Sequence, residues 1–298
     1  LMKKRKLLNQ IRNFFQFIEH QSSIIQGEIL GNSIHTYWWN NVKNFGDLLT
    51  PYILRNLGFS PIHVPHQKAS VILVGSILQR LPEDFSGIIL GSGLIKDIQI
   101  NLKKARILGV RGELTKKNLG IKHDIPLGDP GLVSVNFMRK RQKKKFVLGF
   151  VPHFFDKNDH RINQIKDKFP KQVTIINVNQ SVDSVTNRID QCSYIISSSL
   201  HGLVIADALN IPNTWLKLSH KATRDGFKFY DYYSAFGLKY SPVEITGYDT
   251  LDDLIDKTHK IEKSLVDEIK SNLEKQLGNI GQEVSLLLNE KVKSQTSK

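Results

Sequence analysis

The stretch that most constrains the fold of this chain is residues 195–209, which read IISSSLHGLVIADAL. A short apolar run, a polar turn and a second apolar segment that begins at His201 and Gly202 predict a strand, a turn and a helix. The start of such a helix places unpaired N–H groups and a partial positive charge at the carboxyl end of a strand, where they attract anions. Ligands bind at that edge of open α/β sheets, so Ser198, Ser199, His201 and Gly202 are candidate site residues.

Short apolar runs alternate with helical segments through most of the chain. Alternation of this kind is typical of parallel sheets with crossover helices. We therefore predict an α/β fold of two Rossmann-like, doubly wound domains that face each other across a cleft. Strands are expected near residues 34–39, 70–74, 87–90, 105–110, 146–151, 173–178, 194–197 and 214–218.

Changes in composition divide the chain into four parts. The charged run RKRQKKK at residues 139–145 is predicted to be a solvated connector rather than a binding patch. It separates an N-terminal domain, residues 29–140, from a C-terminal domain, residues 141–245. Residues 246–298 are expected to form helices that pack across both domains. Residues 1–28 are expected to form a basic amphipathic helix, which either lies on an anionic membrane surface or packs on the protein's own core.

Composition limits the partners and the compartment. The 298 residues include 42 Lys and Arg against 28 Asp and Glu, a net charge of +14, which favours an anionic partner. The sequence has neither zinc-finger spacing nor an aromatic-rich RNA-binding signature, so nucleic acid is not expected. The single cysteine, Cys192, fits a reducing compartment, and neither a secretory signal nor an apolar run of about 18 residues is present. We expect a cytoplasmic protein with peripheral contact to the inner face of the plasma membrane.

Three further candidates stand in the first half, where predicted strands end or helices begin. Asp47 of the motif NFGD either caps a helix or faces the cleft. The glycines of Gly91-Ser92-Gly93 would let a ligand approach the backbone, although a lone Gly-x-Gly is a weak signal. Arg111 follows a strand and precedes a helix, so its guanidinium could clamp a phosphate or carboxylate; the alternative is a surface arginine.

The second half adds two histidines and a basic aromatic segment. His153 follows a predicted strand, and packing and function are equally compatible with that place. His201 stands at a helix start beside three serines, where an imidazole suits acid–base exchange near neutral pH. The segment RDGFKFYDYY supplies Arg224 and Lys228 for an anion and aromatic faces for a sugar, unless its aromatic residues are an ordinary buried helix face. We find no set of residues with metal-ligand spacing and predict a metal-independent site.

Together, the ordered motifs NFGD, GSG, VRGELT, GDPG, VPH, SSSLHGLVIADALNIP and KFYDYY resemble those of the polysaccharide pyruvyltransferase family, from about Thr36 to Gly237. The resemblance implies a GT-B-like architecture. It also implies transfer of a pyruvyl group from phosphoenolpyruvate to a saccharide, as a cyclic ketal, in exopolysaccharide, capsule or cell-wall glycan biosynthesis. Phosphoenolpyruvate is then the donor substrate, no cofactor is implied, and the saccharide acceptor could be lipid-linked.

The resemblance also assigns roles to individual residues. It implies that Arg111 binds the anionic groups of the donor and that His201 is central to catalysis. Some family members carry an arginine two residues before that histidine, where this chain has Ser199. Lys228 or Arg224 would then supply the missing charge.

Two other functions are compatible with the sequence. A nucleotide-sugar-dependent GT-B glycosyltransferase would have a similar fold and would bind a nucleoside diphosphate in its C-terminal half. A non-catalytic protein could bind anionic glycans through its basic surface. The glycine turns and polar residues at strand ends argue against the second alternative, because surface binding needs no such arrangement.

Overall fold

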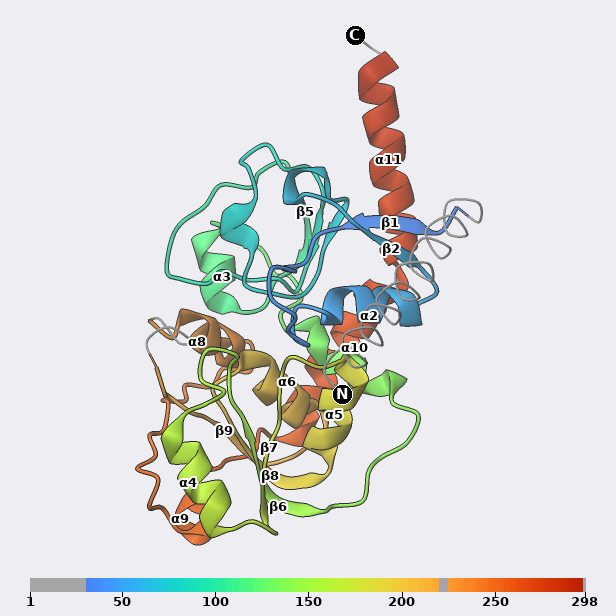
Figure 1. The fold of residues 1–298 in the computed structure, drawn as a ribbon. Helices are drawn as coiled ribbons and strands as arrows, with labels where there is room; N and C mark the ends of the chain where they lie inside the picture. The colour runs from blue at the N-terminus through green and yellow to red at the C-terminus, as the bar shows by residue number, and fades with distance from the viewer. Residues whose placement is uncertain (1–30, 220–224, 297–298) are drawn as a thin grey trace.

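The computed structural model describes residues 31–219 and 225–296. The predicted helix of residues 1–28 and the candidate Arg224 lie outside these residues. The described chain forms two α/β halves, one above the other in Figure 1, and helix α11 projects from the upper half. The predicted α/β fold of two doubly wound halves followed by helices is confirmed.

The upper half contains a five-stranded parallel sheet of order β2-β1-β3-β4-β5. The interior strand β4 is apolar and buried throughout, as expected for a parallel strand covered on both faces. Strand β2 was not predicted because Pro61 interrupts its apolar pattern, and proline is tolerated here because β2 lies at the edge of the sheet. The strands are β1 (Ser33–Thr36), β2 (Ser60–His63), β3 (Val71–Ile72), β4 (Ile88–Leu90) and β5 (Arg106–Gly109).

The lower half contains a four-stranded parallel sheet of order β7-β6-β8-β9. In both sheets the second strand of the chain lies on one side of the first strand, and the third lies on the other side. The switch points, at which open α/β sheets bind ligands, are therefore between β1 and β3 and between β6 and β8. The strands are β6 (Phe146–Val151), β7 (Val173–Ile175), β8 (Cys192–Ser197) and β9 (Asn213–Trp215).

Helices connect the strands, and local sequence explains where several of them start. The side chains of Asp159, Ser181 and Thr250 accept hydrogen bonds from backbone N–H groups in the first turns of α4, α5 and α9. The α-helices are α2 (Leu49–Asn56), α3 (Glu113–Asn118), α4 (His160–Lys168), α5 (Val182–Asp190), α6 (Leu200–Ala208), α8 (Phe227–Ser234), α9 (Leu251–Asp256), α10 (Lys263–Gly278) and α11 (Ile280–Thr296). The 3₁₀ helices are η1 (His66–Lys68), η2 (Leu78–Arg80) and η3 (Pro130–Phe137).

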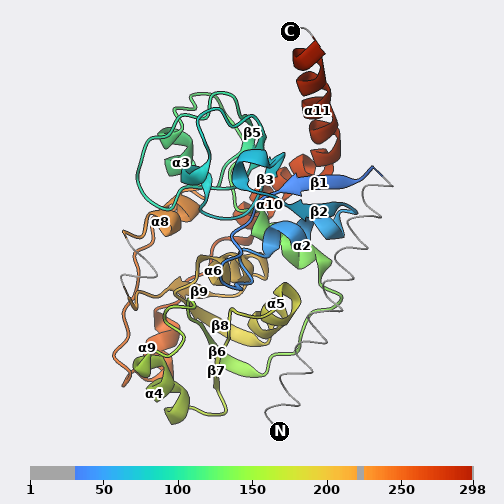
Figure 2. The ribbon, with the colours of Figure 1, turned by 45° about the horizontal axis from the view of Figure 1, so that its top comes forward.

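Helix α6 lies between the two halves. Residues 200–207 are all buried, and a helix that is apolar on every side must be enclosed by protein. It packs on β8 and β9 of its own half and on η3, which also contacts α2 of the upper half. Figures 1 and 2 both place α6 between the sheets. The residues at its start therefore lie at the junction of the halves.

The C-terminal helices run from the lower half to the upper half. Leu254 of α9 belongs to the apolar core of the lower sheet. Helix α10 packs on η3, and Glu283 of α11 pairs with Arg106 of β5, with 2.8 Å between Oε2 and Nε. Among the described residues, no helix has the length and apolar character that a membrane span requires.

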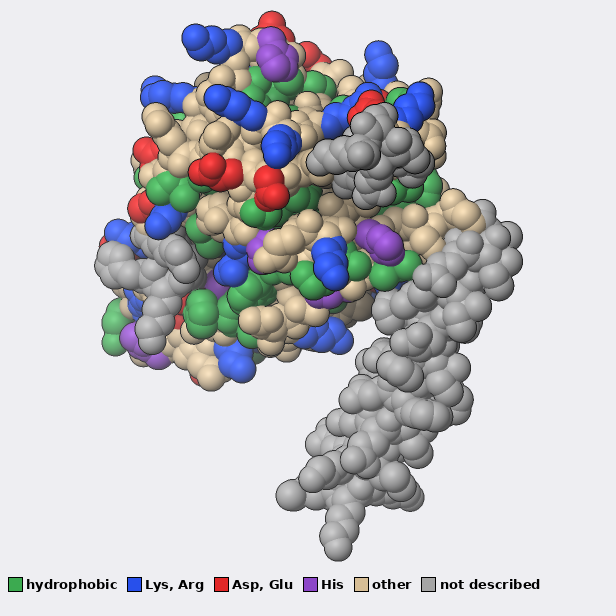
Figure 3. Space-filling view, turned by 90° about the horizontal axis from the view of Figure 1, so that it is seen from above, with side chains coloured by type: hydrophobic (Ala, Val, Ile, Leu, Met, Phe, Trp, Pro, Cys, Tyr) green, Lys and Arg blue, Asp and Glu red, His purple; other side chains and the backbone are tan. Residues whose placement is uncertain are grey.

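The basic residues of the connector are exposed, as predicted, and two of them also bind to the lower half. Arg141 donates two hydrogen bonds, of 3.0 and 2.8 Å, to Oδ1 of the buried Asp190, and Lys144 donates to backbone carbonyls of Asp190 and Cys192. On the face seen in Figure 3, the Lys and Arg side chains are scattered among acidic, polar and apolar groups. On that face the excess positive charge is not gathered into one patch.

Candidate active site

A cavity of about 510 Å³ opens where the two switch points face each other. A larger hollow of about 610 Å³ in the upper half, lined by Lys103, Lys117 and their neighbours, touches neither switch point, so we place the candidate site in the smaller cavity. Its walls follow strand ends: Trp39, Asn44 and Asp47 after β1; Ser76, Ile77, Gln79 and Arg80 after β3; Ile95 and Lys96 after β4; His153, Phe154 and Phe155 after β6; Ser199, Leu200 and His201 after β8; and Lys228 in α8.

The imidazole of His201 lies between the cavity and a buried carboxylate. Its Nε2 is 3.6 Å from Oδ2 of Asp129, whose side chain is fully buried. Neither atom has a hydrogen-bond partner in the described structure, whereas Oδ1 of Asp129 accepts a hydrogen bond from the N–H of Gly131. A carboxylate held in this way can orient the imidazole and stabilise it when it is protonated. A Cβ on Gly46 would overlap the ring, so glycine leaves room for the imidazole at the cavity wall.

Asp47 faces the same cavity from the loop after β1. Burial raises the pKa of its carboxyl from 3.8 to about 6, although His201, Asn44 and Lys228 act in the opposite direction. The amide Nδ2 of Asn44 donates to Oδ2 of Asp47 at 2.9 Å. A carboxyl with this pKa exchanges protons near neutral pH and can serve as an acid or a base.

The raised pKa of Asp47 predicts that the Asp47→Asn variant is more stable than the wild type at pH 8. The folded chain holds the proton more tightly than the unfolded chain, so ionisation of Asp47 costs stability. This cost is absent below about pH 4, grows as the pH rises to about 6, and is complete above that. Asparagine removes the cost, which raises the thermal midpoint by roughly 2–4 °C per kcal/mol. Differential scanning fluorimetry should show the gain at pH 8 and its loss near pH 4, with exposed Asp84→Asn as the control.

Three cationic side chains line the cavity, those of Arg80, Lys96 and Lys228. The guanidinium of Arg80 lies over the ring of Trp39, with Cζ 4.3 Å from the ring centre. Asp47 is the one carboxylate among the described lining residues, so the cavity suits a small ligand with more than one anionic group. Lys228 was predicted from the sequence, whereas Arg80 and Lys96 were not. Their positions shortly after β3 and β4 are the signal that could have found them.

His153 and Ser199 also line the cavity, whereas Ser198 lies behind it. Burial lowers the pKa of His153 to about 3, and Lys228 and His201 act in the same direction, so this imidazole is neutral at physiological pH. The hydroxyl of Ser198 accepts a hydrogen bond from the N–H of His153 and donates one to Asp156 at 2.9 Å. Ser198 is not a lining residue, and the structure instead shows it fixing the backbone of His153.

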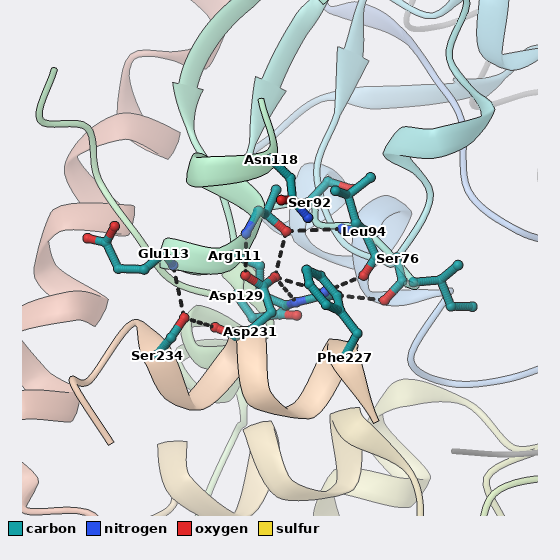
Figure 4. A network of polar contacts seen from close by, with 12 residues as sticks. Ser76, Ser92, Leu94, Arg111, Glu113, Asn118, Asp129, Phe227, Asp231 and Ser234 are labelled. Carbon is teal, nitrogen blue, oxygen red and sulfur yellow. Dashed lines mark hydrogen bonds and ion pairs between the residues drawn. The ribbon is translucent and has the colours of Figure 1, made fainter. Parts of the chain in front are cut away.

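Arg111 was expected to face the donor, but the structure places its side chain outside the cavity. Its side chain is fully buried, and its Nε donates to Oδ2 of Asp231 in α8 at 2.9 Å (Figure 4). The two terminal nitrogens donate to Oγ of Ser76 and to the carbonyl of Leu94. Asp231 also accepts hydrogen bonds from the N–H and hydroxyl of Thr115. The guanidinium therefore forms an ion pair between α8 and the upper half and does not face a donor in the cavity.

The sequence profile of the polysaccharide pyruvyl transferase family matches residues 27–220, more than half of the chain. This chain belongs to the polysaccharide pyruvyl transferase family. The match includes both switch points and ends before Lys228.

Two curated proteins are similar to this family member in sequence. An uncharacterized protein of Acanthamoeba polyphaga mimivirus is 32% identical over 175 residues, which cover 56% of this chain and 60% of that protein. The succinoglycan biosynthesis protein ExoV of Rhizobium meliloti (strain 1021) is 26% identical over 220 residues, which cover 69% of this chain and 66% of that protein. The chain thus spans less than two thirds of the length of these relatives. A solved structure of the wall teichoic acid polymerase TagF aligns over 97% of this chain and 98% of that chain, with a TM-score of 0.43 and 12% identity.

In this pyruvyl transferase family member, the segment Gly91-Ser92-Gly93 does not line the cavity, contrary to expectation. A Cβ on Gly91 would overlap the ring of Pro130, and one on Gly93 would overlap the guanidinium of Arg111. Ser92 is fully buried and donates to a backbone carbonyl at 2.7 Å. The glycines therefore allow close packing within the protein rather than the approach of a ligand.

Gly202 was expected at the site and does not line the cavity, whereas Asp129, which was not among the candidates, contacts His201. A Cβ on Gly202 would overlap the hydroxyl of Ser197, so this glycine lets α6 pack closely on its sheet and does not line the cavity. The motif GDPG reads as a turn, yet its Asp129 is the residue that faces His201. The motifs SSSLHG and GDPG thus meet through His201 and Asp129. No local sequence pattern indicates this contact.

The aromatic residues of segment 224–233 are mainly core residues. Phe229, Tyr232 and Tyr233 are fully buried, so they do not offer faces to a sugar. The aromatic residues that line the cavity are instead Trp39, Phe154 and Phe155.

Proposed function

We propose that this protein transfers the pyruvyl group of phosphoenolpyruvate to a saccharide and forms a cyclic ketal on two hydroxyls of one sugar. Family membership supports the transferred group, and the name of ExoV as a succinoglycan biosynthesis protein supports a role in glycan synthesis. The observation that carries the proposal is the composition of the cavity. Three cationic side chains and a histidine backed by a buried aspartate line one opening between the two switch points.

The cationic side chains suit the proposed donor. Phosphoenolpyruvate carries a phosphate and a carboxylate on one small carbon skeleton. Arg80 can bind either group through two parallel hydrogen bonds, and Lys96 and Lys228 can act as point charges on the other. The N-terminal turn of α6, which begins at the cavity, adds a partial positive charge.

A lipid-linked acceptor and membrane contact stay predictions from the sequence.

The reaction needs two proton transfers and no redox change. A general acid protonates the methylene carbon of phosphoenolpyruvate, and one sugar hydroxyl adds to the central carbon. The bond from that carbon to the phosphate oxygen then breaks, phosphate leaves with the electron pair, and the second hydroxyl closes the ring. One hydroxyl proton ends on the new methyl group and the other on phosphate. His201, oriented by Asp129, and the carboxyl of Asp47 are the cavity groups assigned to these transfers.

The proposal is tested by phosphate release and by ligand-induced stabilisation. Purified protein should release inorganic phosphate from phosphoenolpyruvate only when a suitable saccharide is present, and mass spectrometry should find the pyruvylated sugar. Phosphoenolpyruvate should also raise the thermal midpoint, because a ligand that binds only the folded state stabilises it. Stabilisation by uridine or guanosine diphosphate but not by phosphoenolpyruvate would instead support a nucleotide-sugar-dependent glycosyltransferase. Salt-sensitive glycan binding without phosphate release would support a non-catalytic glycan-binding protein.

Replacing Arg80 with alanine is expected to raise the KM for phosphoenolpyruvate by about 10- to 100-fold, since charge-assisted hydrogen bonds are worth about 1.5–3 kcal/mol. The thermal midpoint of the free protein should change little, because Arg80 is exposed. Initial rates at varied phosphoenolpyruvate concentrations measure the effect. Arg139→Ala, at an exposed arginine that does not line the cavity, is the matched control. An unchanged KM in Arg80→Ala would contradict the assignment of this side chain to the donor.

A further inference from the structure

Three neighbouring rings after β6 form what we call the aromatic rim of the cavity: His153, Phe154 and Phe155. The ring centres of Phe154 and Phe155 are 4.1 Å apart, and those of His153 and Phe154 are 4.3 Å apart. All three residues line the cavity, and Phe155 is 58% exposed. A single exposed apolar side chain is common on protein surfaces, but a set of adjoining aromatic rings at a cavity wall is typical of a binding surface.

Hydrogen bonds hold the aromatic rim in place. Nδ1 of His153 accepts a hydrogen bond from the N–H of Phe155 at 3.4 Å, so this neutral imidazole supports the turn that presents Phe155. Ser198 accepts from the N–H of His153 and donates to Asp156, which also accepts from Ser219. The backbone that carries Phe155 is therefore fixed before any ligand arrives, which lowers the entropic cost of binding.

We propose that the aromatic rim is the acceptor subsite, where the exposed ring of Phe155 stacks on the apolar C–H face of a pyranose. This inference rests on the proposed function, because it assigns the second substrate to the part of the cavity that the donor does not need. The donor is small and doubly charged, and Arg80, Lys96 and Lys228 serve it. A pyranose combines a flat C–H face with hydroxyls around its edge.

The surroundings of the aromatic rim favour a sugar over an acyl chain. The side-chain amides of Asn44 and Gln79 line the same cavity and can hydrogen-bond to ring hydroxyls. Charged groups, among them Lys96 and Lys228, share its walls. The two amides are bonded within the protein through one N–H and the oxygen, which leaves each a second N–H for a ligand. An acyl chain would remove water from these polar and charged walls without offering any hydrogen bond, whereas the hydroxyls of a sugar can bind them.

The test measures binding without turnover. Four probes are used: the methyl β-glycosides of glucose, galactose, mannose and N-acetylglucosamine. Their affinities are measured by saturation-transfer difference NMR, which also shows which sugar protons touch the protein. For at least one glycoside, Phe155→Ala should weaken binding about tenfold and remove the C–H signals, whereas Phe155→Trp should retain both. Tyr248→Ala is the matched control, since Tyr248 is 78% exposed and does not line the cavity.

The outcomes separate this inference from the proposed function. Stabilisation by phosphoenolpyruvate is measured in the same variants and should equal that of the wild type, which also shows that they fold. Wild-type affinity in Phe155→Ala, or binding of none of the four glycosides to the wild type, would overturn the acceptor subsite. The acceptor subsite would also be overturned if Phe155 were needed for binding to phosphatidylglycerol vesicles and no glycoside bound. If glycosides bind through Phe155 but phosphoenolpyruvate neither binds nor reacts, the proposed function fails while the subsite stands.

Discussion

The His201→Ala variant is expected to release phosphate from phosphoenolpyruvate about 10²- to 10⁴-fold more slowly than the wild type, the range typical of general acid–base catalysis. His201 is the histidine that lines the cavity and also has a buried carboxylate 3.6 Å behind it. His153 lines the cavity too, but its lowered pKa keeps it neutral, so it cannot replace the missing acid. The measurement is the initial rate at saturating phosphoenolpyruvate, with the acceptor that the wild type uses.

Two further variants separate catalysis from general damage at this histidine. His123→Ala, at an exposed histidine outside the cavity, should keep the wild-type rate. Asp129→Asn should lower the rate less than His201→Ala and should also move the pH–rate profile, because an amide cannot stabilise the protonated imidazole. Near wild-type rates in His201→Ala, at an unchanged thermal midpoint, would remove His201 from the mechanism.

The sequence predicted the layered architecture because buried parallel strands have a strong signature. Runs such as residues 87–90 are continuously apolar, and each ends at a glycine or polar residue. In parallel sheets the carboxyl ends share one edge, so motifs far apart in sequence were expected to meet, and Asp47, His153 and His201 do line one cavity. Strand β2 escaped prediction because only its edge position makes Pro61 acceptable.

The direction of individual side chains was not predictable, since it depends on partners far away in the chain. Arg111 was expected to face a ligand, but its guanidinium is buried because it binds Asp231, which lies 120 residues later in the chain. Helix α8 packs against α3 and against the apolar core that the two halves share, which buries Phe229. Lys228 and Asp231, three residues apart on that helix, share a side. Lys228 lines the cavity, whereas Asp231 binds Arg111.

The buried pair of Arg111 and Asp231 is expected to be a major source of stability. Arg111→Ala should lower the free energy of unfolding by about 3–5 kcal/mol, because it leaves a carboxylate in the core without its cation. The loss should also loosen α8 against the upper half, since this ion pair joins them. Urea unfolding followed by circular dichroism measures the change. Arg106→Ala, which breaks the partly exposed pair with Glu283, should cost only about 0–1 kcal/mol.

A double variant tests whether the ion pair or the arginine itself matters. Arg111→Met combined with Asp231→Leu removes both charges together, so it should recover much of the stability that Arg111→Ala loses. Its activity should recover in parallel if the pair only holds α8, and with it Lys228, against the cavity. The following results would instead show that Arg111 binds the donor. Arg111→Ala would then unfold like the wild type but bind phosphoenolpyruvate weakly, and the double variant would fold without regaining that affinity.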